Sequence, residues 1–287
     1  MKFGIMFANA GPFAFPDHLE SLARSADEVG IESIWTVEHV VVPVDYKSAY
    51  PYSKSGKMPG PENAPIPDPI LPLAFAAAVT KRLRLGTGVV ILPQRHPTYV
   101  AKEMATLDVL SDGRAMLGVG IGWLREEFAA VGVPFKERAA RTNEAIRAIR
   151  SLWKETPEAF AGTFYAWGPV ECHPKPVQKP GPPIVIGGHS SGAARRAAHY
   201  GNGFFPARGD YDALPKLLSV LRDECAKIGR NPDEIELTTG TGHVDLDAVR
   251  RYQDLGIARL AIAPPAFDKD GIRRGLHDFA DQVIAKL

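Results

Sequence analysis

The feature that most constrains this chain is an alternation of short β-branched apolar runs with amphipathic helical stretches. It occurs eight times and fills the whole sequence, which leaves no room for a second domain. Strands that alternate with helices form parallel sheets, and eight such units predict a closed (β/α)8 barrel. We therefore expect one α/β barrel domain over residues 1–287. Its functional residues should lie in the loops that follow the strands.

The expected strands are short, and two irregular segments interrupt the alternation. One insertion, residues 40–68, follows the second strand and is rich in Pro, Gly and Tyr, as lids and binding loops are. The other, residues 160–183, precedes the fifth strand, and Phe164 and Tyr165 predict a small hairpin in it. A helix whose stripe includes Leu214 and Leu218 has Asp212 as its expected N-cap. We expect the strands at residues 2–8, 33–37, 83–92, 115–119, 183–186, 203–206, 235–239 and 259–263.

Composition excludes several classes of partner. The chain has 34 basic and 33 acidic residues, a balance without the electrostatic footprint of a nucleic-acid or anionic-membrane binder. No apolar run approaches the length that crosses a bilayer. Cys172 and Cys225 make a poor disulfide framework, which predicts a reduced, cytoplasmic setting.

The segment Gly187-Gly188-His189-Ser190 follows the fifth strand and opens a helix. Glycines allow a phosphate to approach the backbone, the first-turn amides are free to donate, and the helix dipole favours an anion. The alternative is a tight turn in which the serine only caps the helix. The residues by themselves leave both interpretations open.

Glu38 and His39 end the second strand, a position typical of catalytic residues in such barrels. A histidine there can hold a near-neutral pKa and move a proton, and we expect Glu38 to orient it. The alternative is that the two residues only orient each other or the loop. A metal site is disfavoured, because no His-x-x-x-His or carboxylate pair has ligand spacing.

Two glycine-rich segments end the third and fourth strands. Residues 85–90 combine glycine with β-branched residues, which predicts either a bulge or strained peptide, or close packing of the strands. Residues 118–123 lack the spacing of a dinucleotide fingerprint, so we expect rim glycines such as Gly120 to let a flat ring lie against the backbone.

Aromatic residues flank the expected rim. Tyr46, Tyr50 and Tyr52 in the lid either stack on a ring or cover the barrel mouth, and we interpret them as packing residues by default. Trp123 can likewise stack on a ring or cover the barrel mouth, from the other side of the rim. An aromatic-rich lid would exclude water from a hydride transfer.

Together these segments resemble the bacterial luciferase-like monooxygenase superfamily, and within it the short-chain branch of probable coenzyme F420-dependent oxidoreductases. The resemblance covers essentially the whole chain. It implies a barrel with a deazaflavin or flavin at the rim where the strands end. The residues that carry it are 33–43, 85–89, 117–123 and 180–188.

The resemblance also implies roles for particular residues. Family members have a non-prolyl cis peptide at the end of the third strand that supports the ring, and this position is Gly88-Val89 here. The glycine pair after the fifth strand, Gly187 and Gly188, is implied to cradle the cofactor phosphate. His39 matches a histidine that handles a proton or orients the substrate. Cofactor contacts are also expected at Gly120, Trp123, His189 and Ser190.

This sequence departs from the pattern of the superfamily at one position that bears on the substrate. The sugar-phosphate dehydrogenases of this superfamily have an acidic residue shortly after the fourth-strand glycines, where this chain has Trp123. A sugar phosphate is therefore disfavoured, although Glu126 and Glu127 follow one turn later.

The leading hypothesis is hydride transfer between coenzyme F420 and a small organic substrate, with His39 as general acid or base. The first alternative is an FMN-dependent monooxygenase that receives reduced flavin from a partner reductase. A second is a non-catalytic cofactor-binding or storage protein. An aldolase-like barrel is disfavoured because no lysine ends a strand as expected. Family habit implies a homodimer.

Overall fold

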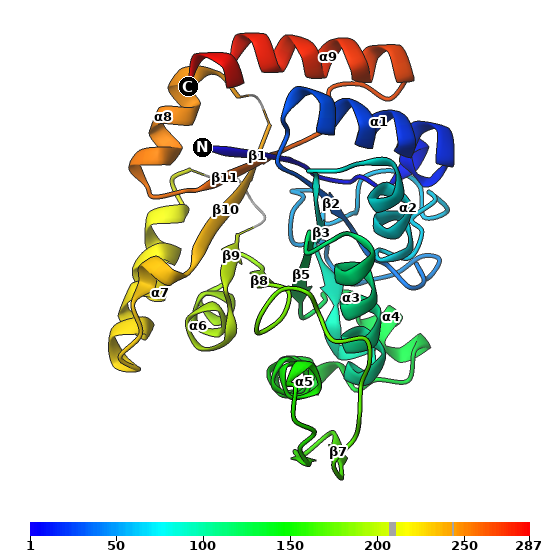
Figure 1. Ribbon diagram of the computed structural model, residues 1–287, viewed down its shortest axis with the longest axis vertical. Helices are drawn as coiled ribbons and strands as arrows, with labels where there is room; N and C mark the ends of the chain where they lie inside the picture. The colour runs from blue at the N-terminus through cyan, green and yellow to red at the C-terminus, as the bar shows by residue number, and fades with distance from the viewer. Residues whose placement is uncertain (207–210, 243) are drawn as a thin grey trace.

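In the computed structural model, which describes residues 1–206, 211–242 and 244–287, parallel strands close into a barrel surrounded by helices (Figure 1). The hydrogen-bonded order is β3-β2-β1-β11-β10-β9-β8-β5-β4, and β3 also pairs with β5 and so closes the ring. Because β3 and β4 are two parts of one barrel strand, the expected (β/α)8 barrel is confirmed. The barrel strands are β1 (Lys2–Ile5), β2 (Ser33–Thr36), β3 (Arg84–Thr87), β4 (Val90–Ile91), β5 (Ala115–Gly120), β8 (Ile184–Gly187), β9 (Gly203–Phe205), β10 (Glu236–Thr241) and β11 (Arg259–Ile262).

The helices bury the apolar stripes that their periodicity predicts, but one expected cap is wrong. Helix α7 begins after Ala213, not after Asp212, and has no side-chain cap. Pro215 lies in its first turn and has no N–H group for a cap to bind. The helices are α1 (Pro16–Val29), α2 (Leu71–Val79), α3 (Pro97–Leu110), α4 (Arg125–Ala130), α5 (Arg138–Trp153), α6 (Ser191–Tyr200), α7 (Leu214–Lys227), α8 (Leu246–Asp254) and α9 (Lys269–Gln282).

Two expectations from composition concern membrane-spanning helices and the cysteines. Within the described ranges, no helix combines the length and apolarity that a bilayer span requires. Both cysteines are buried and free, and Cys225 lies on the buried face of α7.

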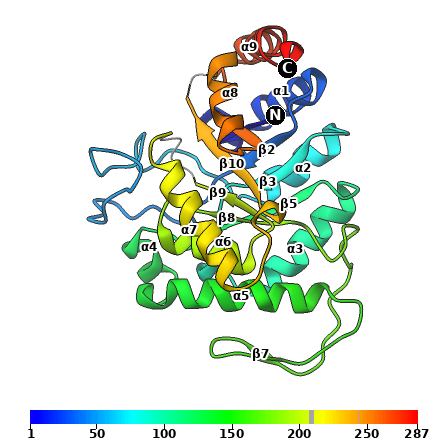
Figure 2. The same cartoon turned by 90° about the vertical axis from the view of Figure 1, so that its left-hand side faces the viewer.

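Both insertions are present. Figure 2 shows segment 40–68, in light blue, extending to one side of the barrel, and a hairpin lying beyond α5. The hairpin pairs β6 (Phe160–Ala161) with β7 (Ala166–Trp167), as the sequence predicted. Its turn is held by Glu144 of α5, whose carboxylate accepts the N–H groups of Thr163, Phe164 and Tyr165.

The barrel interior is filled, so it is not a channel. Trp35 packs there with Met116, Val185, Phe205 and Ala261. At the end where the strands begin, the buried guanidinium of Arg259 donates to Glu32 at 2.7 Å and to Glu236 at 2.6 Å. Because side chains close this end, a ligand site belongs at the opposite rim.

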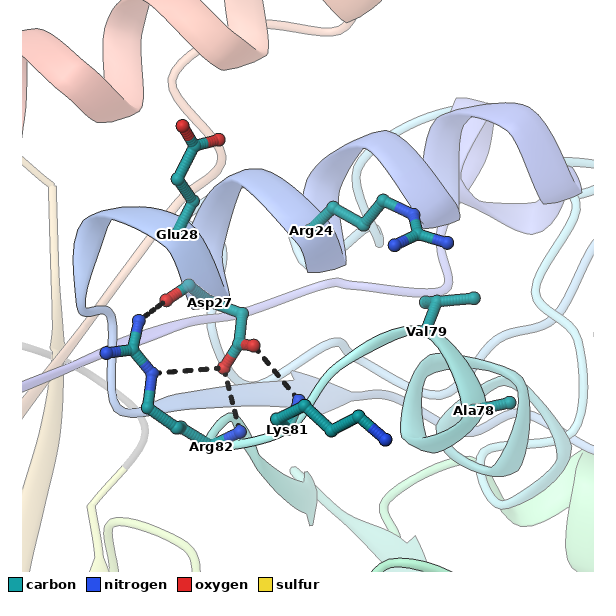
Figure 3. Close-up of a pocket in the computed structure, with 7 residues that line it drawn as sticks. All are labelled: Arg24, Asp27, Glu28, Ala78, Val79, Lys81 and Arg82. Atoms are coloured by element: carbon teal, nitrogen blue, oxygen red, sulfur yellow. Dashed lines mark hydrogen bonds and ion pairs between the residues drawn. The ribbon is translucent and has the colours of Figure 1, made fainter.

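At the same closed end, hydrogen bonds to one carboxylate hold the start of β3. The carboxylate of Asp27, near the end of α1, accepts the N–H groups of Lys81, Arg82 and Leu83 at 2.8–3.0 Å. Figure 3 shows Asp27 with Lys81 and Arg82 in a pocket between α1 and α2. The pocket lies away from the strand C-termini, so we interpret it as structural.

We expect Asp27→Ala to lower the free energy of unfolding by about 2 kcal/mol, because it leaves three amides without their acceptor. Burial raises the pKa of Asp27, but the three N–H donors outweigh it and hold the pKa below 3.8. The stabilisation is therefore present above pH 3.8 and is lost as the pH falls through the lowered folded-state pKa. Urea unfolding of wild type and variant at neutral and acidic pH measures both effects. Glu28→Gln, on the same helix, is the control. An equal loss of stability in this variant would contradict the stabilising role of the Asp27 hydrogen bonds.

Candidate active site

The third barrel strand is interrupted by a bulge at the rim. Before the bulge, Gly86 pairs with Met116 of β5, and after it Val90 pairs with Val119. Three residues on this strand thus oppose two on β5, which confirms the predicted bulge. The predicted close packing is also present, since a Cβ atom on Gly86 would lie 2.6 Å from the Trp35 ring.

The peptide bond between Gly88 and Val89 within this bulge is cis, as the resemblance implied. The half-buried Val89 side chain lies between two other strands. A Cβ atom on Gly120 would come within 2.6 Å of Val89 Cγ2, and one on Gly187 within 2.5 Å of Val89 Cγ1. Val89, Gly120 and Gly187 therefore form a continuous surface across three strand ends, which we call the Val89 platform.

Next to the platform, the β8–α6 turn presents free amide groups. The Ser190 side chain caps α6 by accepting the N–H group of Ala193 at 3.2 Å, so the capping interpretation is confirmed. In the part of the chain that the structure describes, the N–H groups of Ser191 and Gly192 have no acceptor. Gly188 has a φ of +121°, which side chains rarely adopt. This turn can cap its helix and still offer donors to an anion.

His39 is held by a carboxylate that the sequence did not identify. Its Nδ1 lies 3.0 Å from Oε2 of Glu127 in α4, and Oε1 of Glu127 accepts the Val40 N–H group at 2.7 Å. The Glu127 side chain is completely buried. Because a carboxylate only accepts, Nδ1 carries the hydrogen and Nε2 is the accepting nitrogen of the neutral ring.

Glu38 does not orient His39, which corrects the expectation. The two side chains have separate partners although the residues are adjacent. The Glu38 carboxylate accepts the Ile91 N–H group and pairs with Arg95. Arg95 also donates to Asp68 at 2.6 Å. Burial raises the pKa of Glu38, although Arg95 opposes the shift. Glu38 thus ties the end of β2 to the end of the lid.

Helix α4 also anchors the lid. Glu126 accepts the N–H group of Lys47 at 2.7 Å and the hydroxyl of Ser48 at 2.7 Å. The Ser48 hydroxyl and the lid amides lower the pKa of Glu126 to about 2. At the far end of the lid, Asn9 donates to the carbonyl of Pro67 at 3.0 Å. The adjacent acids Glu126 and Glu127 therefore clamp the lid and His39 from one helical turn.

Rings from the lid and the rim form a continuous aromatic row. The centroids of His39 and Trp123 are 5.7 Å apart, and those of Trp123 and Tyr50 are 5.2 Å apart. Tyr50 contacts Tyr52 at 5.2 Å, and Tyr52 contacts His189 at 4.9 Å. These five residues are the aromatic row. The lid tyrosines do pack, as expected, but they pack along the rim from His39 to His189.

Comparisons with known proteins agree with this arrangement. A family model described as luciferase-like monooxygenase matches residues 1–251. An uncharacterized protein of Mycobacterium tuberculosis is 32% identical over 93% of this chain and 94% of its own length. An F420-dependent glucose-6-phosphate dehydrogenase of Nakamurella multipartita is 32% identical over 92% of this chain and 74% of its own. The crystal structure of a monooxygenase from Streptomyces bottropensis, 27% identical, superimposes with a TM-score of 0.77 and covers 100% of this chain and 99% of its own.

Proposed function

We propose an F420-dependent reaction on a small organic substrate for this chain, which belongs to the luciferase-like monooxygenase family and is an oxidoreductase. The observation that carries the proposal is the Val89 platform, with the free amides of α6 beside it and a histidine on the same rim. The relative from Nakamurella multipartita, whose name states F420 dependence, supports the choice of cofactor.

The residues present fit a planar cofactor with a phosphate. A side chain at Gly120 or Gly187 would occupy the space of Val89, so the platform depends on both glycines. The amides of Ser191 and Gly192, at the positive end of the α6 dipole, would hold the phosphate. His189 and Ser190 line the turn between these two features. Bound F420 would supply a carbon that accepts or gives up a hydride.

The protein itself would supply proton handling and exclusion of water. Nε2 of His39 is the accepting nitrogen and can take the proton of a substrate hydroxyl, or return it to a carbonyl oxygen once protonated. Glu127 keeps the ring in the tautomer that leaves Nε2 open. The clamped lid and Trp123, whose ring packs edge-on against His39, would limit the access of water to this side chain, which is 9% exposed.

Titration of the purified chain with F420 and, separately, with FMN tests the proposal. We expect F420 to bind at least about tenfold more tightly than FMN. Gly187→Val should weaken F420 binding by about tenfold or more, because the new side chain displaces Val89. Gly168→Val is the control, since its Cβ atom would meet nothing within 4 Å. Tighter binding of FMN, or no binding of either cofactor by folded protein, contradicts the proposal.

The second candidate is an FMN-dependent monooxygenase that receives reduced flavin from a separate reductase. It is favoured by the likeness over the whole chain to the Streptomyces bottropensis monooxygenase. The same titration separates the two candidates, because the platform and the free amides would serve either cofactor.

A further inference from the structure

The aromatic row crosses one particular sector of the rim. It begins at His39, after β2, and ends at His189, after β8. In the barrel order, the strands between β2 and β8 are β3–β4 and β5. These carry Val89 and Gly120, so the row spans the sector of the Val89 platform. A substrate that reaches His39 and the platform together must lie against these rings.

The carboxylates next to the row already have hydrogen-bond partners within the protein. Glu127 is occupied by His39 and Val40, and Glu126 by the lid amides at Lys47 and Ser48. No permanent cation belongs to the row itself. The row therefore offers an anionic substrate no permanent cation to pair with.

The tyrosine hydroxyls of the row stay neutral. Burial and the neighbouring tyrosines raise the pKa of Tyr50 to about 12, and burial also raises the pKa of Tyr52. Next to His39 in the sequence, Val40 and Val41 are 48% and 44% exposed. Exposed apolar side chains gathered at a site favour an apolar ligand, because covering them removes their surface from water.

We propose that Trp123, Tyr50 and Tyr52 form the substrate-recognition surface, and that it selects an uncharged apolar or aromatic alcohol or carbonyl compound over a sugar phosphate. This rests on the proposed function, because it takes His39 as the group that meets the substrate oxygen. The rings would contact the carbon skeleton of the substrate, and aromatic faces and edges suit planar or cyclic skeletons.

Equilibrium binding tests this without turnover. Benzyl alcohol and glucose 6-phosphate are each titrated into the F420-loaded chain by calorimetry or ligand-observed NMR. We expect benzyl alcohol to bind at least about tenfold more tightly, and Tyr50→Ala to weaken it by about tenfold with little change in F420 affinity. Tyr50→Phe should retain binding, because the argument uses the ring and not the hydroxyl. Tyr99→Ala, at a 71% exposed tyrosine of α3, is the control.

The outcomes separate this inference from the proposed function. Equal or tighter binding of glucose 6-phosphate overturns the inference, as does a folded Tyr50→Ala variant with wild-type affinity for benzyl alcohol. Should Tyr50→Ala fail to fold, the comparison of the two ligands on wild-type protein still decides. Ring-dependent binding of benzyl alcohol by a chain that does not bind F420 would refute the proposed function and leave the recognition surface standing.

Discussion

His39→Ala is expected to lower kcat by about 10²–10⁴-fold, the contribution of a positioned general acid or base, and to leave F420 affinity within about twofold of wild type. The reason is geometric. The imidazole is held by Glu127 just after β2, whereas the platform residues lie at the ends of β3, β5 and β8. The proposed proton-handling group and the proposed cofactor surface therefore belong to different strand ends and can be removed separately.

The measurement is steady-state kinetics with the alcohol that the wild-type chain oxidises fastest, together with cofactor titration of each variant. His277→Ala, an exposed histidine of α9, is the matched control. If His39 only orients the substrate, KM rises and kcat changes little. An unchanged kcat would remove His39 from proton transfer, and a parallel loss of F420 affinity would make it part of the cofactor site.

The barrel was predictable because its signal is local and repeated. Strands such as β2 and β8 are short apolar runs in a regular alternation with helices, and they lie where the sequence predicted them. The third strand was predicted as continuous over residues 83–92, whereas the chain forms β3 and β4 around a bulge. The glycines at 86 and 88 indicated that bulge, but only the pairing with β5 gives its register.

Helix α4, which holds the decisive carboxylate, was not predicted. It has six residues, fewer than two helical turns, and no side-chain cap, so its periodicity is too short to recognise. Leu124 and Phe128, four apart around two acidic residues, were the available signal. The partners of Glu127 lie 87 and 88 residues away along the chain. No local pattern reports a contact of that separation.

The pairing of Glu38 with His39 shows the opposite error. Adjacent residues suggested a contact, but beyond β2 the two side chains bind different elements of the fold. Glu38 pairs with Arg95, and the carboxylate that binds His39 is Glu127 of α4. Sequence therefore predicted a proton-handling role for His39 and named the wrong partner for it.

That partner gives the second large effect. Glu127→Gln is expected to lower kcat by about 10²-fold or more with the fold intact, because the change replaces the acceptor that faces His39 Nδ1 with a donor. The glutamine oxygen can still accept the Val40 N–H group, which turns the amide NH₂ toward His39 Nδ1. Nδ1 must then accept, so the hydrogen moves to Nε2. The nitrogen that should take the substrate proton becomes a donor.

A structural role for Glu127 in supporting α4 can be distinguished from a role in setting the His39 tautomer. Loss of support for α4 would lower the free energy of unfolding and weaken cofactor binding, whereas loss of the tautomer leaves both and alters the pH profile of kcat. Two-dimensional NMR of the His39 ring nitrogens reads the tautomer directly, and we expect it to switch in Glu127→Gln. Glu137→Gln, which breaks an exposed ion pair with Arg141, is the matched control. A variant with wild-type kcat and an unchanged tautomer would show that His39 does not depend on Glu127 for its proton chemistry.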